Sequence, residues 1–341
     1  MNSRRLRRAL PRLIPTDQPI FESRRRFIRT LSGGAIGLAW STPVIAMECS
    51  QPAADESQML EVPFARPEVF PATRSERFNP ANVEMTLRKT AASHNNFYEF
   101  LPGRGGPVYK YVEDFEVAPW TIEVTGECGN PRVFDLDDLF EFEHEERVYH
   151  FRCVETWAMN VPWTGFPLSR LLDAVAPKSS AKFVRFVTAN RPSQMPGMKE
   201  AHWYNWPYYE ALRMDEARNE LAMLVTGIYG EPLLKQHGAP VRVICPWKYG
   251  YKSPKSIVRI ELVREQPATF WNDSSPREYG FYSNVNPNVP HPRWSQAQEY
   301  LLDDRDTKRP TKLFNGYAGF VSDLYPNEPR EPLDKAPDDP I

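Results

Sequence analysis

Cysteine is scarce in this chain, and its cysteines form no metal-binding pattern. The 341 residues include only Cys49, Cys128, Cys153 and Cys245, with no Cys-x-x-Cys and no Cys/His cluster of zinc spacing. A structural zinc site and a haem attached through Cys-x-x-Cys-His are therefore excluded. If one cysteine binds a metal, at least one of the other three must be unpaired, and the sequence does not fix the pairing.

Long apolar runs are also missing. A transmembrane helix needs about 20 apolar residues, whereas the uncharged apolar stretch of residues 30–46 is shorter and is interrupted by glycines and Pro43. No internal repeat is visible, glycine is ordinary at 17 residues, and proline is frequent at 34. We therefore expect long ordered loops, and no transmembrane helix in the mature chain.

The short apolar stretch follows a twin-arginine export pattern. Residues 23–29 read Ser-Arg-Arg-Arg-Phe-Ile-Arg, in which Arg24 and Arg25 are the pair. Small residues precede Met47 and form an acceptable cleavage site, so residues 1–46 are predicted to be a signal peptide. This pathway exports proteins that have already folded, often around a cofactor. We therefore predict a periplasmic protein with a prosthetic group.

Removal of the signal peptide changes the charge balance. Residues 1–46 hold nine arginines and two acids, and the whole chain has a net charge of −2, so the mature part carries −9. Nucleic-acid-binding proteins present basic faces, and an acidic mature chain argues against such a partner. The 295 residues after position 46 can bury a sizeable core in one large domain or two smaller ones.

Hydrophobic periodicity indicates an α+β fold with a mainly antiparallel, curved sheet. Strands are predicted at residues 120–125, 147–153, 182–188, 221–226, 239–245 and 256–262, and helices at 135–140, 167–175 and 207–218. Residues 47–90 read as an extended N-terminal arm, 91–265 as the folded core, and 266–341 as a proline-rich C-terminal wrap packed on the core. The aromatic residues of that last segment argue against a disordered tail.

Cys153 is the cysteine best suited to chemistry. It ends a predicted strand beside Arg152, and a neighbouring cation favours the thiolate. A thiolate is a soft ligand that suits a redox metal. Cys245, in an apolar strand, is more typical of a small buried hydrophobe. A nucleophilic role for Cys153 stays possible, although no Cys-His-Asn pattern supports it.

A basic segment downstream is a candidate anion site. Its charged residues are His237, Arg242, Lys248, Lys252 and Lys255, interleaved with three aromatic residues. A phosphate is bound by a fork-shaped arginine, lysine charges and free backbone N–H groups. Lysine runs are more often solvated loops, but the interleaved aromatic residues favour a packed, shaped loop.

Together these segments resemble the sulfite-oxidase-like molybdoenzymes, and within them the catalytic subunits of periplasmic protein-methionine-sulfoxide reductases. Each matching segment is unspecific by itself, but the ordered set is highly specific. The segments are Asn95-Asn96-Phe97-Tyr98-Glu99, Arg152-Cys153-Val154-Glu155-x-Trp157, Trp163-x-Gly165-Phe166-Pro167-Leu168, His237-Gly238-Ala239-Pro240-Val241-Arg242, Trp247-Lys248-Tyr249-Gly250, Glu278-Tyr279-Gly280-Phe281-Tyr282 and His291-Pro292-Arg293-Trp294-Ser295-Gln296-Ala297.

The resemblance implies a molybdopterin-binding fold with one molybdenum on a single molybdopterin. It also implies Cys153 as the metal ligand and catalytic residue. The pterin contacts that it implies are Asn95, Tyr98, Glu99, Thr188, His237, Arg242, Ser253, Pro254 and Lys255. Relatives often carry Asn at the place of His237, and Pro254 removes a backbone donor. We therefore expect the contact there to rest on Lys255 and on the backbone N–H groups of Ser253 and Lys255.

The implied function is reduction of methionine sulfoxide in periplasmic proteins, with electrons from a membrane haem b subunit, MsrQ, and the respiratory chain. The nearest alternative is sulfite oxidation. Many sulfite oxidases carry an immunoglobulin-like dimerisation domain of about 100 residues, whereas 76 residues follow position 265 here without regular strand spacing. We therefore expect no C-terminal dimerisation domain and a soluble monomer within a two-subunit system. Tyr279, Tyr282 and Trp294 are expected to border a shallow mouth.

A cofactor-free exported binding protein is the alternative from another class. It would explain the acidic mature chain. It would not explain a signal for folded export or the ordered set of motifs.

Overall fold

The computed structural model describes residues 59–80, 83–101 and 107–333. All of them belong to one compact unit, Ala54–Ile341. The predicted signal peptide, Cys49 and the last eight residues lie outside the described residues.

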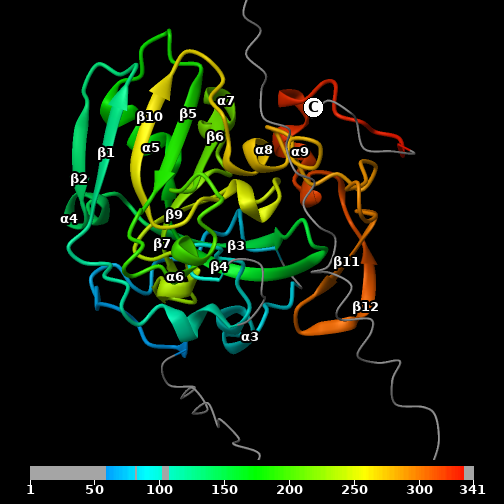
Figure 1. Ribbon diagram of the computed structural model, residues 1–341, viewed down its shortest axis with the longest axis horizontal. Helices are drawn as coiled ribbons and strands as arrows, with labels where there is room; N and C mark the ends of the chain where they lie inside the picture. Colours follow the sequence, from blue (N-terminus) through cyan, green and yellow to red (C-terminus); the bar gives the residue numbers. More distant parts are fainter. Residues whose placement is uncertain (1–58, 81–82, 102–106, 334–341) are drawn as a thin grey trace, which may run out of the picture. The chain divides into compact units, whose positions relative to one another are not determined.

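A five-stranded sheet forms one side of this unit. Its strand order is β2-β1-β10-β5-β6, and only the β1–β10 pair is parallel. In Figure 1, β10 lies between β1 and β5. The strands are β1 (Thr121–Gly126), β2 (Arg132–Asp135), β5 (Phe183–Thr188), β6 (Tyr209–Arg213) and β10 (Ile257–Val263).

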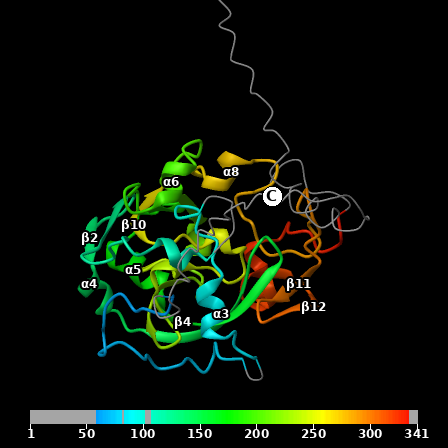
Figure 2. The same ribbon diagram turned by 60° about the horizontal axis from the view of Figure 1, so that its bottom comes forward.

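A seven-stranded sheet contains the strand that directly precedes Cys153. Its main path is β12-β11-β4-β7-β8, with β3 paired to β4 and β9 paired to β7. Only the β11–β4 pair is parallel, and Figure 2 shows β11 and β12 beside β4. The strands are β3 (Glu145–Arg152), β4 (Trp157–Pro167), β7 (Met223–Ile228), β8 (Glu231–Pro232), β9 (Arg242–Ile244), β11 (Gln298–Leu301) and β12 (Asp304–Pro310).

The helices of the described part are short. Leu168 to Val175 forms an amphipathic helix whose apolar residues are fully buried. None of the described helices is both long and apolar enough to cross a bilayer. The helices are α3 (Arg88–Ser93), η1 (Val108–Tyr111), α4 (Leu136–Phe140), α5 (Leu168–Val175), α6 (Pro196–Glu200), α7 (Met214–Ala217), η2 (Lys235–His237), η3 (Gly250–Lys252), α8 (Phe270–Ser274), η4 (Leu313–Gly316), α9 (Ala318–Val321) and η5 (Ser322–Leu324).

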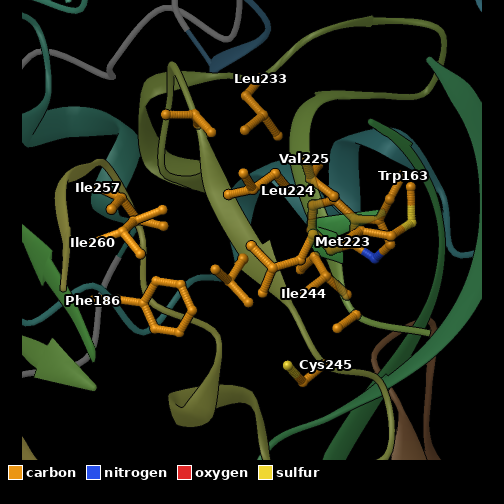
Figure 3. Packing of buried hydrophobic residues seen from close by; sticks show 14 of the residues in the cluster. Trp163, Phe186, Met223, Leu224, Val225, Leu233, Ile244, Cys245, Ile257 and Ile260 are labelled. Atoms are coloured by element: carbon orange, nitrogen blue, oxygen red, sulfur yellow. The ribbon is translucent and has the colours of Figure 1, made fainter. Parts of the chain in front are cut away.

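The main hydrophobic core joins the two sheets. Phe186 of β5 and Ile260 of β10 belong to the same buried cluster as Leu224 of β7 and Ile244 of β9, and Figure 3 shows them packed around β9. All four are fully buried. Close packing of this kind is what fixes the angle between the sheets.

Gly165 allows β4 to pack tightly against β7. A Cβ at this position would lie 2.1 Å from the carbonyl oxygen of Leu224. The register of the β4–β7 pair shifts at this glycine. A larger residue would therefore force the two central strands apart.

Most predicted elements are present, and the fold class is the expected α+β arrangement with mainly antiparallel sheets. The helix predicted at 207–218 is wrong, because Tyr209–Arg213 form strand β6 and only Met214–Ala217 form a helical turn, α7. β6 pairs with β5 and its first four residues are all buried, so tertiary pairing overrides the helical pattern. Strands β2, β4, β8, β11 and β12 lie outside the predicted strands.

Candidate active site

Most of the predicted site residues line one open pocket of about 840 Å³ of empty space. The pocket lies where the turn after β3 meets the segment before β1 and the loop between β9 and β10. The predicted residues that line it are Asn95, Tyr98, Glu99, Cys153, Arg242, Ser253, Pro254 and Lys255. Thr188 and His237 do not line it.

Cys153 is presented by a tight turn between β3 and β4. The N–H of Thr156 donates to the carbonyl of Cys153 at 3.1 Å, and Thr156 adopts φ 76° to close the turn. The sulfur accepts from the backbone N–H of Glu155 at 3.4 Å and from Asn96 Nδ2 at 3.6 Å. Such donors favour a thiolate, but the protein alone keeps the thiol neutral. Burial and the charge of Glu155 raise the pKa of Cys153 to about 12.

The position of Arg152 beside Cys153 suggested that its charge stabilises the thiolate, but in the structure this charge is paired with a carboxylate. The Arg152 side chain is fully buried and bonds Glu299 of β11 at 3.1 Å and Gln296 at 2.9 Å. Glu299 therefore neutralises much of the guanidinium charge. The Arg152 side chain thus links the turn at Cys153 to β11.

Arg242 and Lys255 form the cationic wall of the pocket. Arg242 is 2% exposed, and its guanidinium donates to the carbonyls of His237 at 2.8 Å and Ser253 at 3.2 Å. Among the described residues, no carboxylate pairs with it by an ion pair. Burial lowers the pKa of Arg242 to about 9. Burial and the charge of Arg242 also lower the pKa of Lys255.

Gly238 lets the preceding loop approach Lys255. It adopts φ +96°, and a Cβ there would lie 2.6 Å from the Lys255 Cβ. A residue with a side chain would therefore displace Lys255 as well as strain the backbone. The glycine thus holds the two basic segments together.

His237 lies behind this wall and outside the pocket. It is 1% exposed, and neither ring nitrogen has a hydrogen-bond partner among the described residues. Burial and the charge of Arg242 lower the pKa of His237 to about 3, so its ring is neutral. Its contribution to the site in this structure is its carbonyl, which accepts from Arg242.

Glu99 and Thr188 form a second buried layer. Burial raises the pKa of Glu99, and the charge of Lys255 and a hydrogen bond from Thr188 oppose that rise. Thr188 ends β5 and also bonds the carbonyl of Tyr208 at 3.1 Å. Thr188 therefore supports the pocket through Glu99 and Tyr208 without lining it.

Several of the expected donors are already engaged. The N–H of Ser253 donates to the carbonyl of Gly250 at 3.1 Å, so the expectation that it is free for a phosphate is wrong. Asn95 uses its side-chain amide on the carbonyls of Ala91 and Ala92, at the end of α3. The cationic side chains of the lining are those of Arg242 and Lys255, and Lys255 Nζ also donates to the carbonyl of Asn96 at 2.9 Å.

Two of the three lysines in the basic segment belong to the core. Lys248 pairs with Glu216 of α7 at 2.6 Å, and Lys252 pairs with Glu210 of β6 at 2.5 Å. All four side chains are fully buried. The phosphate role suggested for the lysines therefore falls to Lys255 alone.

The other side chains that line the pocket are mainly aromatic. Trp157, Tyr208, Tyr251, Trp271 and Tyr279 line it together with Asn96 and Glu155. The ring of Trp271 on α8 contacts Tyr98 and Tyr279, with centroids 5.0 and 5.3 Å away. The sequence offered one signal for these residues, the density of aromatic residues around the motifs. Their spacing along the chain did not show that they converge.

The expected mouth residues lie at or near the pocket. Tyr279 lines it, whereas Tyr282 lines a neighbouring pocket. Trp294 is half-buried and donates from its indole Nε1 to the carbonyl of Val154 at 2.9 Å. The thiols of Cys128, Cys153 and Cys245 are free.

The chain is similar to known proteins over most of its length. Residues 109–271 match the family described as oxidoreductase molybdopterin binding domain. The protein-methionine-sulfoxide reductase catalytic subunit MsrP of Burkholderia mallei is 44% identical, with 93% of each chain covered. MsrP of Xanthomonas axonopodis is 43% identical, covering 93% of this chain and 95% of the relative.

Among solved structures, the sulfane dehydrogenase SoxCD from Paracoccus pantotrophus matches with a TM-score of 0.41 and 18% identity. The match covers 74% of this chain and 60% of that one.

Proposed function

We infer, since this chain belongs to the MsrP family of protein-methionine-sulfoxide reductase catalytic subunits, that it reduces methionine sulfoxide in proteins at a molybdenum–molybdopterin centre. One observation carries the inference. The buried Cys153, the buried guanidinium of Arg242 and the half-buried ammonium of Lys255 meet in one open pocket. In the reaction, a sulfoxide takes up two electrons and two protons and gives a thioether and water.

The residues present fit this cofactor. Arg242 is a buried guanidinium bonded to main-chain carbonyls, and a phosphate would supply the anion that such a buried charge requires. Lys255 stands beside it and has a lowered pKa. A bound anion would favour the ammonium form of Lys255 and raise its pKa again.

Cys153 would hold the metal. A thiolate ligand must lose its proton, and metal binding drives that loss. The pKa of the Cys153 thiol lies near 12 in the protein alone, so the N–H donors of Asn96 and Glu155 would take effect once a cation is bound. When bound, the cofactor supplies the two-electron chemistry.

The remaining lining residues would position the substrate. Trp271 and Tyr279 form an aromatic wall suited to a thioether side chain, and Tyr98, an expected pterin contact, packs against Trp271. Glu155 accepts hydrogen bonds from Asn96 at 3.0 Å and from Trp157 at 3.4 Å, which fix its carboxylate at the pocket. The open pocket admits water, the final source of protons.

Electron supply and location are further parts of the proposal. We propose that a membrane haem b subunit, MsrQ, passes electrons from the respiratory chain to this subunit. The twin-arginine pattern of residues 23–29 supports export of the folded, loaded protein to the periplasm. Oxidised periplasmic proteins would then be its substrates, met by a soluble monomer.

The test combines metal content with two assays. The purified exported protein should contain one molybdenum per chain by elemental analysis. With a reduced artificial donor it should reduce methionine sulfoxide in an oxidised, unfolded protein. Efficient oxidation of sulfite without any reduction of protein-bound sulfoxide would instead establish the sulfite oxidase alternative.

A further inference from the structure

A second pocket adjoins the one that holds Cys153. It encloses about 690 Å³ of empty space and is lined largely by residues 276–292. Val154, Tyr251 and Tyr279 line both pockets, so a molecule held at the cysteine can extend over a shared wall. The cofactor contacts proposed above lie in the first pocket and leave the second unexplained.

Most buried polar groups in the second pocket are already satisfied. The amides of Asn284 and Asn286 donate to the two carboxylate oxygens of Glu328, at 2.9 and 2.8 Å. The carbonyl oxygen of the Asn284 side chain accepts from Lys248 at 3.1 Å. These groups form part of the fold and offer little to a ligand.

Two buried donors in this lining lack an acceptor. His291 Nε2 and the Tyr249 hydroxyl donate to no group among the described residues, although the backbone N–H of Asn286 approaches the Tyr249 oxygen. The side chain of His291 is 2% exposed and Tyr249 is 7% exposed. A buried polar group without a partner is costly, so both groups need an explanation.

The hydrogen bonding of His291 identifies its free nitrogen as a donor. Its Nδ1 accepts the backbone N–H of Arg293 at 3.2 Å, which leaves the proton on Nε2. The carboxylate of Glu278 lies 3.5 Å from Nε2 but is held by Arg293 at 2.7 Å. Burial and the charge of Arg293 lower the pKa of His291 to about 4, so the ring is neutral at pH 7.

We propose that this second pocket binds the substrate main chain beside the oxidised methionine, with His291 Nε2–H and the Tyr249 hydroxyl donating to a peptide carbonyl. The proposal rests on the proposed function and adds the site that recognises the main chain of the substrate protein. Carboxylates of Glu278 and Glu328 share the lining, which disfavours an anion and favours a neutral acceptor. The one lining arginine, Arg277, is exposed.

The first test is a matched pair of substitutions at His291. Asn has a polar atom near the position of Nδ1 and loses the Nε2 donor, whereas Gln reaches the position of Nε2. With molybdenum-loaded enzyme, His291→Asn should raise KM about fivefold for a short peptide with a central methionine sulfoxide, as expected for one neutral hydrogen bond. His291→Gln should stay near the wild type. Both should leave the kinetics of dimethyl sulfoxide, which has no peptide group, unchanged.

The second test removes the hydroxyl group of Tyr249. Tyr249→Phe should raise the peptide KM by a similar factor. Tyr229→Phe is the control, because its hydroxyl bonds the carbonyl of Thr86 at 2.5 Å and lies outside both pockets. Equal KM values for the peptide in wild type, His291→Asn and Tyr249→Phe would overturn the proposal, as would parallel losses on dimethyl sulfoxide.

Calorimetric binding of the same peptide separates this inference from the proposed function. Weaker peptide binding in His291→Asn, in an enzyme that reduces no sulfoxide, would support the second pocket and reject the reductase. Sulfoxide reduction with peptide affinity independent of His291 would support the reductase and reject the second pocket.

Discussion

Arg242 illustrates how a single side chain can reveal a missing counter-charge. A guanidinium that is 2% exposed normally pairs with a carboxylate, yet this one bonds main-chain carbonyls. The fold holds these carbonyls in place through Gly238 and the loop before β10. The result is a preformed cationic site facing the pocket of Cys153.

Removal of the Arg242 charge should empty the cofactor site. We expect Arg242→Ala to lower cofactor affinity more than tenfold, because charge-assisted hydrogen bonds contribute about 1.5–3 kcal/mol. The molybdenum content per chain measures this loss. Arg264→Ala is the control, since Arg264 is an exposed arginine paired with Glu127. Full molybdenum loading of Arg242→Ala would rule out the phosphate role.

Cys153 and Cys245 form a natural pair for comparison, because both are buried free thiols. Cys153→Ser should abolish sulfoxide reduction while the circular dichroism spectrum is retained, because a hydroxyl is a poor soft ligand. Cys245→Ser should retain turnover and lower stability by roughly 1–3 kcal/mol, since it buries a hydroxyl in a core strand. Normal turnover by pure Cys153→Ser would refute the ligand assignment.

At the level of strands and helices, β11 has an unexpected part in the site. It pairs in parallel with the start of β4, next to the turn of Cys153. Its residue Glu299 bonds Arg152 at 3.1 Å and His150 at 2.7 Å. A strand from the C-terminal region thereby fixes the strand that carries the cysteine.

Glu299 should make stability depend on pH. Burial opposes its ionisation, but hydrogen bonding and charge from His150 and then Arg152 outweigh it and lower the pKa. A carboxyl whose folded pKa is depressed stabilises the fold above its unfolded pKa, and this contribution is lost as pH falls through the folded pKa. Glu299→Gln should therefore cost on the order of 3 kcal/mol at pH 7, because it leaves Arg152 uncompensated.

Denaturant unfolding of wild type and Glu299→Gln at several pH values measures this dependence. The difference in unfolding free energy should shrink as the pH falls below about 4.5, the ordinary pKa of a glutamate. Glu261→Gln serves as a control in a less buried ion pair with Arg185. A difference that stays constant from pH 7 to pH 3 would contradict the role given to Glu299.

For the molecule as a whole, cofactor loading and export are linked in our proposal. Arg242 is buried and Lys255 is half-buried at the inner side of the pocket, so we propose that the cofactor is inserted in the cytoplasm, where the chain folds. A pathway that carries folded proteins meets this requirement. The twin-arginine pattern at Arg24 and Arg25 is the corresponding sequence signal.

Replacement of Arg24 and Arg25 by lysines should therefore block export. The charge stays the same while the receptor-read pair is lost. We expect a folded, unprocessed precursor in the cytoplasm, which cell fractionation and immunoblotting would detect. Efficient appearance of the lysine variant in the periplasm would refute twin-arginine routing.

The sequence by itself determined the family and the fold class and singled out Cys153 as the candidate ligand, because these depend on ordered local motifs and on short-range periodicity. The tertiary structure decided which basic side chains are paired with carboxylates in the core and which can bind a ligand. Lys248 and Lys252 look equivalent to Lys255 in the sequence, but Glu216 and Glu210 neutralise them in the core. The pairing of β11 with β4 and the unpartnered donors of His291 and Tyr249 likewise depend on contacts between distant segments. Local patterns do not encode such contacts, because each depends on how the whole chain packs.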